Sequence, residues 1–284
     1  MKISSLLCLD SRGFHRTQYY DWGDTDNPRV LVCVHGLTRN GRDFDFLAAS
    51  LESEFRVVCP DIAGRGQSDW LEAKTDYGYP QYMADMTALL ARLTAGDAAK
   101  EIYWLGTSMG GILGMILASL PKSPLAKLVV NDAGMHVPKA ALERIALYVG
   151  ADERFANIAA LEAHLRHTCA SFGPLSDEGW RHLTVHGAVD HPDGTWGMRY
   201  DPAIANAFDG PLADIDLSPY WDAVTCPTLL LRGADSDLLL SETAVAMTQR
   251  GPRAALVEFA GVGHAPMLMT PEEVRIVREF LRGP

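Results

Sequence analysis

A serine held between two glycines is the clearest chemical signal in the sequence. The run Gly106-Thr107-Ser108-Met109-Gly110 follows a short apolar segment at 101–105 and precedes a helix-forming segment at 109–120. A serine on a tight strand-to-helix turn holds its hydroxyl out of the sheet, and only small flanking residues permit that strained backbone. We therefore predict that Ser108 is a nucleophile.

A serine mechanism also needs a base, because an alcohol is a weak nucleophile at neutral pH. His264 lies in the run 261–266, directly after the last strand-like segment, with Gly263 on one side and Ala265 on the other. A loop at that point lies at the same end of the sheet as Ser108, so we predict that His264 is the base. A second candidate, His35, is interpreted as a structural histidine that shapes its own turn.

The third group that a serine mechanism needs is an acid that orients the base, and two carboxylates are candidates for it. Both follow the apolar segment 228–231, in the run Gly233-Ala234-Asp235-Ser236-Asp237. We favour Asp237, because Leu238 and Leu239 follow it and suit a half-buried carboxylate that accepts from an imidazole N–H. Asp235 stays open as the alternative, and the residue that is not used is expected to be a solvated loop or cap group.

The remaining requirement is a pair of donors for the oxyanion of a tetrahedral intermediate. One is expected to be the backbone N–H of Met109, next to the nucleophile. The other is expected from the backbone N–H of Leu37, because Gly36 before it permits a close approach of the main chain.

Short β-branched segments alternate with helical ones along most of the chain. This pattern predicts an α/β fold, with a mostly parallel sheet covered by helices on both faces. Thr270, Pro271 and Glu273 predict a capped start for the last helix. The expected strands are 29–34, 55–59, 101–105, 126–130, 228–231 and 255–259, and the expected helices are 44–51, 80–93, 109–120, 241–249 and 271–281.

A long insertion interrupts this alternation. Nearly 100 residues separate the strands predicted at 126–130 and 228–231, far more than one crossover helix requires. Residues 134–222 contain helical patterns at 140–148, 161–169 and 177–186 and no convincing strand. We predict a helical cap at 134–222 over an α/β core made of residues 1–133 and 223–284.

At these positions the chain resembles the α/β-hydrolase superfamily. His35-Gly36 is similar to the family's oxyanion loop, residues 106–110 to its nucleophile elbow, and residues 61–69 to its D-x-x-G-x-G-x-S segment, while 134–222 falls where the family inserts a cap. The resemblance covers nearly the whole chain. It implies the α/β-hydrolase fold. The chain has no G-x-x-x-x-G-K-[ST] motif and no dinucleotide-binding glycine spacing, so we expect no cofactor.

The resemblance also implies the chain order Ser108, Asp237, His264 for the triad, since family members with an R-G-x-x-S-D run use its final Asp. Dehalogenases and soluble epoxide hydrolases of this fold carry Asp where Ser108 stands, which argues against those chemistries. Ring-fission C–C hydrolases usually carry Trp after the catalytic histidine, where this chain has Ala265.

The resulting hypothesis is a serine hydrolase that cleaves a small neutral ester, thioester or lactone through an acyl-enzyme on Ser108. An acyltransferase or a C–C bond hydrolase would use the same triad, and a noncatalytic small-molecule receptor would use the same pocket. Between 134 and 222 there are 6 Lys and Arg against 13 Asp and Glu. A negatively charged cap predicts a preference for neutral substrates, unless a pocket arginine such as Arg39 or Arg199 selects an acidic one.

Composition excludes several other classes of function. The net charge of −11 and the lack of a basic cluster argue against nucleic acid as a partner, and no apolar run approaches the length of a membrane span. We expect a cytoplasmic protein that binds a small-molecule substrate. His164, His167 and Cys169, or His182 with His186, have helical spacing but no evident carboxylate partner, so we expect no metal site.

Overall fold

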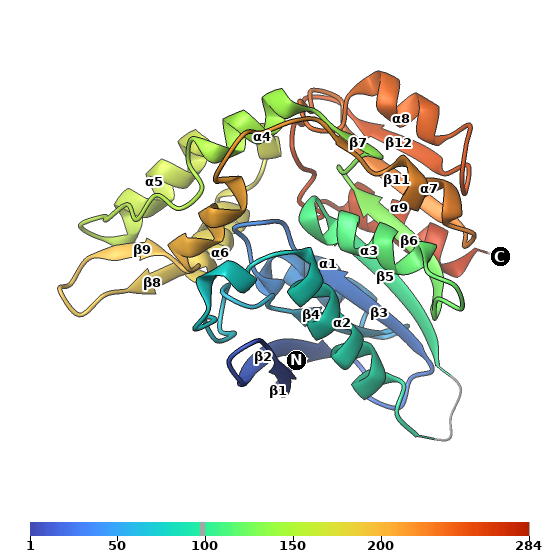
Figure 1. The fold of residues 1–284 in the computed structure, drawn as a ribbon, viewed down its shortest axis with the longest axis horizontal. Coiled ribbons are helices and arrows are strands. Elements are labelled where there is room, and N and C mark those ends of the chain that lie inside the picture. Colours follow the sequence, from blue (N-terminus) through green and yellow to red (C-terminus); the bar gives the residue numbers. More distant parts are fainter. Residues whose placement is uncertain (97–99, 284) are drawn as a thin grey trace.

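The computed structural model describes residues 1–96 and 100–283, and its centre is an eight-stranded sheet (Figure 1). The strand order is β1-β2-β4-β3-β5-β6-β11-β12. All neighbours from β4 to β12 pair in parallel, and the β1–β2 hairpin adds to β4 in antiparallel register. The strands are β1 (Lys2–Leu9), β2 (Phe14–Trp22), β3 (Arg29–Val34), β4 (Arg56–Pro60), β5 (Glu101–Thr107), β6 (Leu125–Asn131), β11 (Thr228–Gly233) and β12 (Ala255–Phe259).

The predicted α/β architecture is confirmed, and all six predicted strands are present. The sequence analysis did not identify β1 and β2. Outward-facing residues of this hairpin, such as Leu7 and Phe14, are exposed, and its other face is only partly covered, so it lacks the continuous apolar run of a central strand.

Helices cover both faces of the sheet because alternate side chains of each strand point in opposite directions. On β3, Val30, Val32 and Val34 belong to one core cluster, and Leu31 and Cys33 belong to the other. The first cluster includes side chains of α2 (Tyr79–Leu93), α3 (Met109–Ser119) and α8 (Ser241–Met247), and the second includes those of α1 (Asp45–Leu51) and α9 (Pro271–Arg282).

The last helix begins as the sequence predicts. Thr270 accepts from the N–H of Glu273, whose carboxylate accepts from the N–H of Thr270, so both halves of the capping box are formed. None of the helices in the described part of the chain has the length and apolar character needed to span a bilayer.

The predicted insertion contains the three expected helices and also two small sheets that were not expected. β8 (Ala188–Asp190) pairs with β9 (Trp196–Met198), and β7 (His136–Val137) pairs with β10 (Ile215–Asp216). These strands have two or three residues each, too short to leave an alternating pattern in the sequence. The helices are α4 (Lys139–Ala146), α5 (Ile158–Thr168), α6 (Asp177–Gly187) and, at its end, α7 (Ser218–Ala223).

The helices α4, α5 and α6 and the β8–β9 hairpin extend together beyond one end of the sheet (Figure 1). In contrast, α7 packs against α3, and its Trp221 is fully buried in the core. The predicted cap boundary at residue 222 therefore falls within a helix that packs on the core.

Candidate active site

Ser108 lies on a strained turn between β5 and α3. Its backbone has φ 53° and ψ −115°, in a region that L-residues seldom adopt. A Cβ at Gly106 would lie 2.0 Å from the carbonyl oxygen of Gly110, and a Cβ at Gly110 would lie 2.0 Å from that of Val34. Both glycines are therefore required by close packing of the main chain, as the sequence predicts.

His264 lies within hydrogen-bond reach of Ser108. Its Nε2 is 2.9 Å from Oγ of Ser108. The loop that carries it, after β12, is held from the insertion side, because Gly263 N–H donates to the carbonyl of Ser171 at 2.7 Å and Ser171 Oγ donates to the carbonyl of His264 at 3.2 Å. The structure thus brings together the two residues that the sequence proposes as nucleophile and base.

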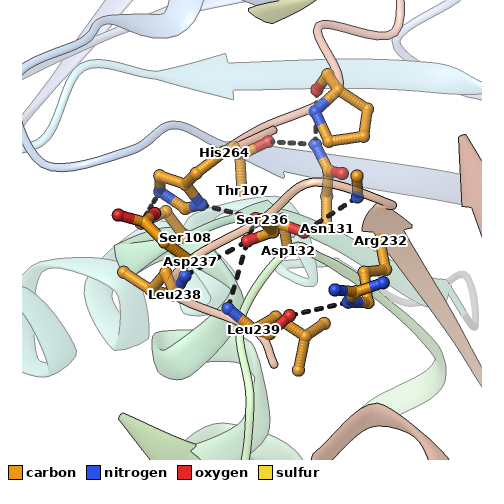
Figure 2. A network of polar contacts seen from close by, with 12 residues as sticks. Thr107, Ser108, Asn131, Asp132, Arg232, Ser236, Asp237, Leu238, Leu239 and His264 are labelled. Atoms are coloured by element: carbon orange, nitrogen blue, oxygen red, sulfur yellow. Dashed lines mark hydrogen bonds and ion pairs between the residues drawn. The ribbon is translucent and has the colours of Figure 1, made fainter. Parts of the chain in front are cut away.

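The carboxylate beside His264 is Asp132, which corrects the expectation of Asp237. Oδ2 of Asp132 lies 2.6 Å from Nδ1 of His264, and the side chain is fully buried. Two further donors point at the same carboxylate: the N–H of Gly233 at 3.0 Å from Oδ1 and Oγ of Ser236 at 2.6 Å from Oδ2 (Figure 2). These contacts orient a carboxylate that is ready to accept from an imidazole N–H.

Asp237 and Asp235, the two acids considered in the sequence analysis, have other partners. The carboxylate of Asp237 forms an ion pair with Arg144 of α4, and about half of its side chain is exposed. Asp235 is exposed, and its N–H donates to the carbonyl of Val262. In the run that follows β11 it is Ser236 that turns inward, because its hydroxyl is the partner of Asp132 and also accepts from Leu238 and Leu239 N–H.

Asp132 follows directly from β6, which is the neighbour of β5 in the sheet. The carboxyl ends of parallel strands meet at one edge, so the residue after β6 lies close to the residue after β5. The sequence signal that could have identified Asp132 is the polar pair Asn131-Asp132 at the end of an apolar run. Asn131 supports the arrangement, because its Nδ2 donates to Thr107 Oγ1 at 3.0 Å and to the carbonyl of Pro266 at 2.8 Å.

The loop that is expected to supply one oxyanion donor passes close to Ser108. A Cβ at Gly36 would lie 3.6 Å from Cβ of Ser108, so the main chain before Leu37 passes close to the nucleophile. Arg65 fixes that loop, since its Nε donates to the carbonyl of Leu37 at 2.8 Å. Met109 is the first residue of α3, where backbone N–H groups have no partner within the helix.

His35 has the structural role that the sequence predicts. Its Nε2 accepts from the N–H of Ile62 at 3.0 Å, so its Nδ1 carries the proton and donates to the carbonyl of Gly36 at 2.7 Å. Burial lowers the pKa of His35 to about 3, so the ring stays neutral near pH 7. A neutral ring with both nitrogens engaged shapes the loop and has no free nitrogen for proton transfer.

The D-x-x-G-x-G-x-S segment supports the same loop through hydrogen bonds. The buried Asp61 accepts from the N–H groups of Gly41 at 2.7 Å and Gln67 at 2.8 Å. Gly66 is required there, because a Cβ would lie 2.2 Å from the Asp61 carboxylate. Burial raises the pKa of Asp61 to about 6.

Comparison with known proteins agrees with this geometry. The sequence model described as the alpha/beta hydrolase family matches residues 31–275. The chain belongs to the alpha/beta hydrolase family. Its sequence is 44% identical over 291 residues to the 3-hydroxybutyrate-oligomer hydrolase of Cupriavidus necator, with 99% of this chain and 98% of that protein covered.

Solved structures show the same fold for this hydrolase. An alpha/beta hydrolase from Novosphingobium aromaticivorans has a TM-score of 0.85 and 35% identity, with 98% of each chain covered. A protein from Rickettsia typhi has a TM-score of 0.92 and 32% identity, with 99% of each chain covered. The named relatives are hydrolases and esterases, which supports ester hydrolysis as the general chemistry of this alpha/beta hydrolase.

A cavity of about 480 Å³ opens above Ser108 in this hydrolase. It is lined by the loop at 35–39, by α4 and α5 of the insertion and by the loop that carries His264. Two arginines face it, and both are paired: Arg39 holds Asp43 through two hydrogen bonds of 2.8 and 2.7 Å, and Arg144 holds Asp237. The other arginine considered in the sequence, Arg199, lines a second cavity of about 270 Å³.

Proposed function

We propose that this hydrolase cleaves carboxylic esters through an acyl-enzyme on Ser108, with His264 as the base and Asp132 as the orienting acid. The observation that carries the proposal is the continuous contact from Ser108 Oγ to His264 Nε2 at 2.9 Å and from His264 Nδ1 to Asp132 Oδ2 at 2.6 Å. Each distance is in the range required for proton transfer or orientation.

The reaction follows from the roles of these groups. Ser108 Oγ attacks the ester carbonyl while its proton passes to Nε2 of His264, and Asp132 stabilises the imidazolium that forms. The backbone N–H groups of Leu37 and Met109 are the proposed donors to the oxyanion of the tetrahedral intermediate. His264 then protonates the leaving alcohol, and a water molecule deprotonated by His264 hydrolyses the acyl-enzyme.

For the substrate, we propose short oligomers of a 3-hydroxyacid such as 3-hydroxybutyrate. The 44% identity to a 3-hydroxybutyrate-oligomer hydrolase over nearly the full length of both chains supports this class. Every ester link in such an oligomer is small and neutral, as the sequence analysis expects, but one end of the oligomer carries a carboxylate. Arg144 lines the cavity and pairs with the half-exposed Asp237, and it favours the alternative in which the pocket accepts that charge.

The test is a comparison of kcat/KM for three compounds: a 3-hydroxybutyrate dimer or trimer, its methyl ester, and a simple aryl butyrate. We expect turnover of all three, with the free-acid oligomer at least as good as its methyl ester. Turnover of the aryl ester without turnover of either oligomer would contradict the proposed substrate class of 3-hydroxyacid oligomers. It would still support ester hydrolysis by a serine mechanism. Lack of turnover and of labelling by a fluorophosphonate would favour a noncatalytic receptor.

A further inference from the structure

Three potential metal ligands from two parts of the chain meet away from the triad. Asp45 is the first residue of α1 in the core, and His182 and His186 lie one turn apart on α6 of the insertion. One ligand atom from each of the three residues lies within 4.8 Å of the other two. The sequence reveals the histidine pair but not the carboxylate, because 137 positions separate Asp45 from His182.

The two histidines are partly buried and close to each other. Their ring centroids are 4.4 Å apart. His182 also packs edge-on against Phe46, at 5.1 Å between centroids, and its Nε2–H donates to the carbonyl oxygen of Arg42 at 2.9 Å, so Nδ1 is the nitrogen left to bind a metal. Packing therefore limits how far His182 can turn away from its partners.

Asp45 has one oxygen engaged and one without a partner. Its Oδ2 accepts from Nε of Arg42 at 2.7 Å and lies 3.4 Å from Nε2 of His182. Its Oδ1 is buried and, among the described residues, receives no hydrogen bond. A buried carboxylate oxygen without a donor is costly, so this atom is an unfilled position for a cation or a proton donor.

We propose that His182, His186 and the carboxylate of Asp45 form a binding site for a divalent first-row transition metal such as zinc. Two imidazoles and one carboxylate are a common three-ligand set for zinc, with water in the fourth position. Tetrahedral binding at about 2.0–2.2 Å per ligand places the ligand atoms roughly 3.3 Å apart, so the side chains close by about 1.5 Å at most.

The surroundings leave room for the ion and its water. Arg42 stays on Oδ2, and the charge that it contributes is balanced by the carboxylate. Arg42 and His186 line the second cavity of about 270 Å³, so the cluster borders a space that can hold a water ligand.

A metal ion at this position would link the insertion to the core. α6 already contacts the active-site loop here, because Nδ2 of Asn40 donates to the carbonyl of His186 at 3.1 Å. Asn40 lies three residues after Leu37, the proposed oxyanion donor. Metal binding would therefore stabilise the packing of α6 on the loop that borders Ser108.

The test is zinc titration of the whole protein, with a chromophoric chelator as competitor and thermal unfolding as a second readout. We expect one zinc ion per chain with a dissociation constant on the order of 1–10 µM, and a Tm that rises with zinc concentration. His186→Gln and His182→Gln, each checked for folding, should weaken binding at least tenfold, and the same change at the partly exposed His136, His136→Gln, should not.

A second buried group of three potential ligands, Cys8, His15 and Asp85, provides the contrasting site. Zinc binding that survives in both His182→Gln and His186→Gln but is lost in Cys8→Ser would overturn the proposal. Failure of the wild-type protein to bind zinc at 100 µM would also overturn it. Neither result would bear on ester hydrolysis at Ser108, which is measured separately.

Discussion

Oδ2 of Asp132 lies 2.6 Å from Nδ1 of His264, although the two residues are 132 positions apart in the chain. Asp132 comes from the carboxyl end of β6, and His264 from the loop after β12. Because β11 lies between these strands, its terminal loop passes beside both residues and contributes Gly233 and Ser236 as donors to the carboxylate. The acid is thus supplied by β6, and the loop after β11 orients it.

This assignment predicts different effects for two aspartates. Asp132→Asn should lower kcat about 10²-fold or more, because an amide does not stabilise the imidazolium and can favour the wrong histidine tautomer. Asp237→Asn is the matched control and should lower kcat less than tenfold on a neutral aryl ester. Steady-state kinetics on folded variants measure both values. The opposite ranking would return the acid role to Asp237.

The sequence was sufficient to predict that Ser108 and His264 lie together, because each depends on a local pattern: Ser108 between obligatory glycines, and His264 on a loop after the last strand. The acid depends on which strand ends are neighbours and on which way a five-residue loop turns. Asp235 and Asp237 had the expected chain position, but Ser236 is the residue that points inward. The β1–β2 hairpin was missed for a related reason, since its exposed face does not have the pattern of a buried strand.

Gly106→Ala should prevent stable folding. The new Cβ would lie 2.0 Å from the carbonyl oxygen of Gly110, which cannot easily move because it accepts from Nε1 of Trp104 at 3.0 Å. We expect a loss of unfolding free energy of about 4 kcal/mol or more, measured by urea denaturation or seen as loss of soluble protein. Gly78→Ala is the control, since its nearest new contact is an ordinary 3.7 Å, and should cost about 1 kcal/mol or less. Equal stability of the two variants would contradict the close packing at the turn.

Stability should fall as the pH is lowered, partly because of His35. The folded-state pKa of about 3 lies below the usual 6.5, so the unfolded chain binds a proton at a pH where the folded protein does not. The stability that a neutral His35 contributes is therefore present above pH 6.5 and is lost as the pH falls toward 3. This corresponds to about 3 kcal/mol between pH 7 and pH 4.

The measurement is urea unfolding of the wild type and of His35→Gln across that pH range. Glutamine offers an oxygen to the N–H of Ile62 but does not titrate, so the variant should show a shallower loss of stability. Comparing the two proteins isolates His35 from other groups, including Asp61 and His186. Identical pH dependence in both would contradict the burial argument.

Arg144 should contribute to selection of the carboxylated substrate. It lines the cavity and pairs with Asp237 at a partly exposed position, so its guanidinium can also meet a substrate carboxylate. Arg144→Gln should lower kcat/KM for a 3-hydroxybutyrate dimer about tenfold relative to that for its methyl ester. A change that is equal for both compounds would mean that Arg144 acts only through the packing of α4.

The most direct test of the central claim is to identify the residue that becomes acylated. A fluorophosphonate or a slowly hydrolysed ester is added, the reaction is quenched, and the modified peptide is mapped by mass spectrometry. We predict a single covalent adduct on Ser108, its absence in Ser108→Ala with a fall in kcat of ~10⁴-fold or more, and much slower labelling in Asp132→Asn than in Asp237→Asn. An adduct on another residue, or a Ser108→Ala protein that keeps a tenth of the wild-type turnover, would contradict the account.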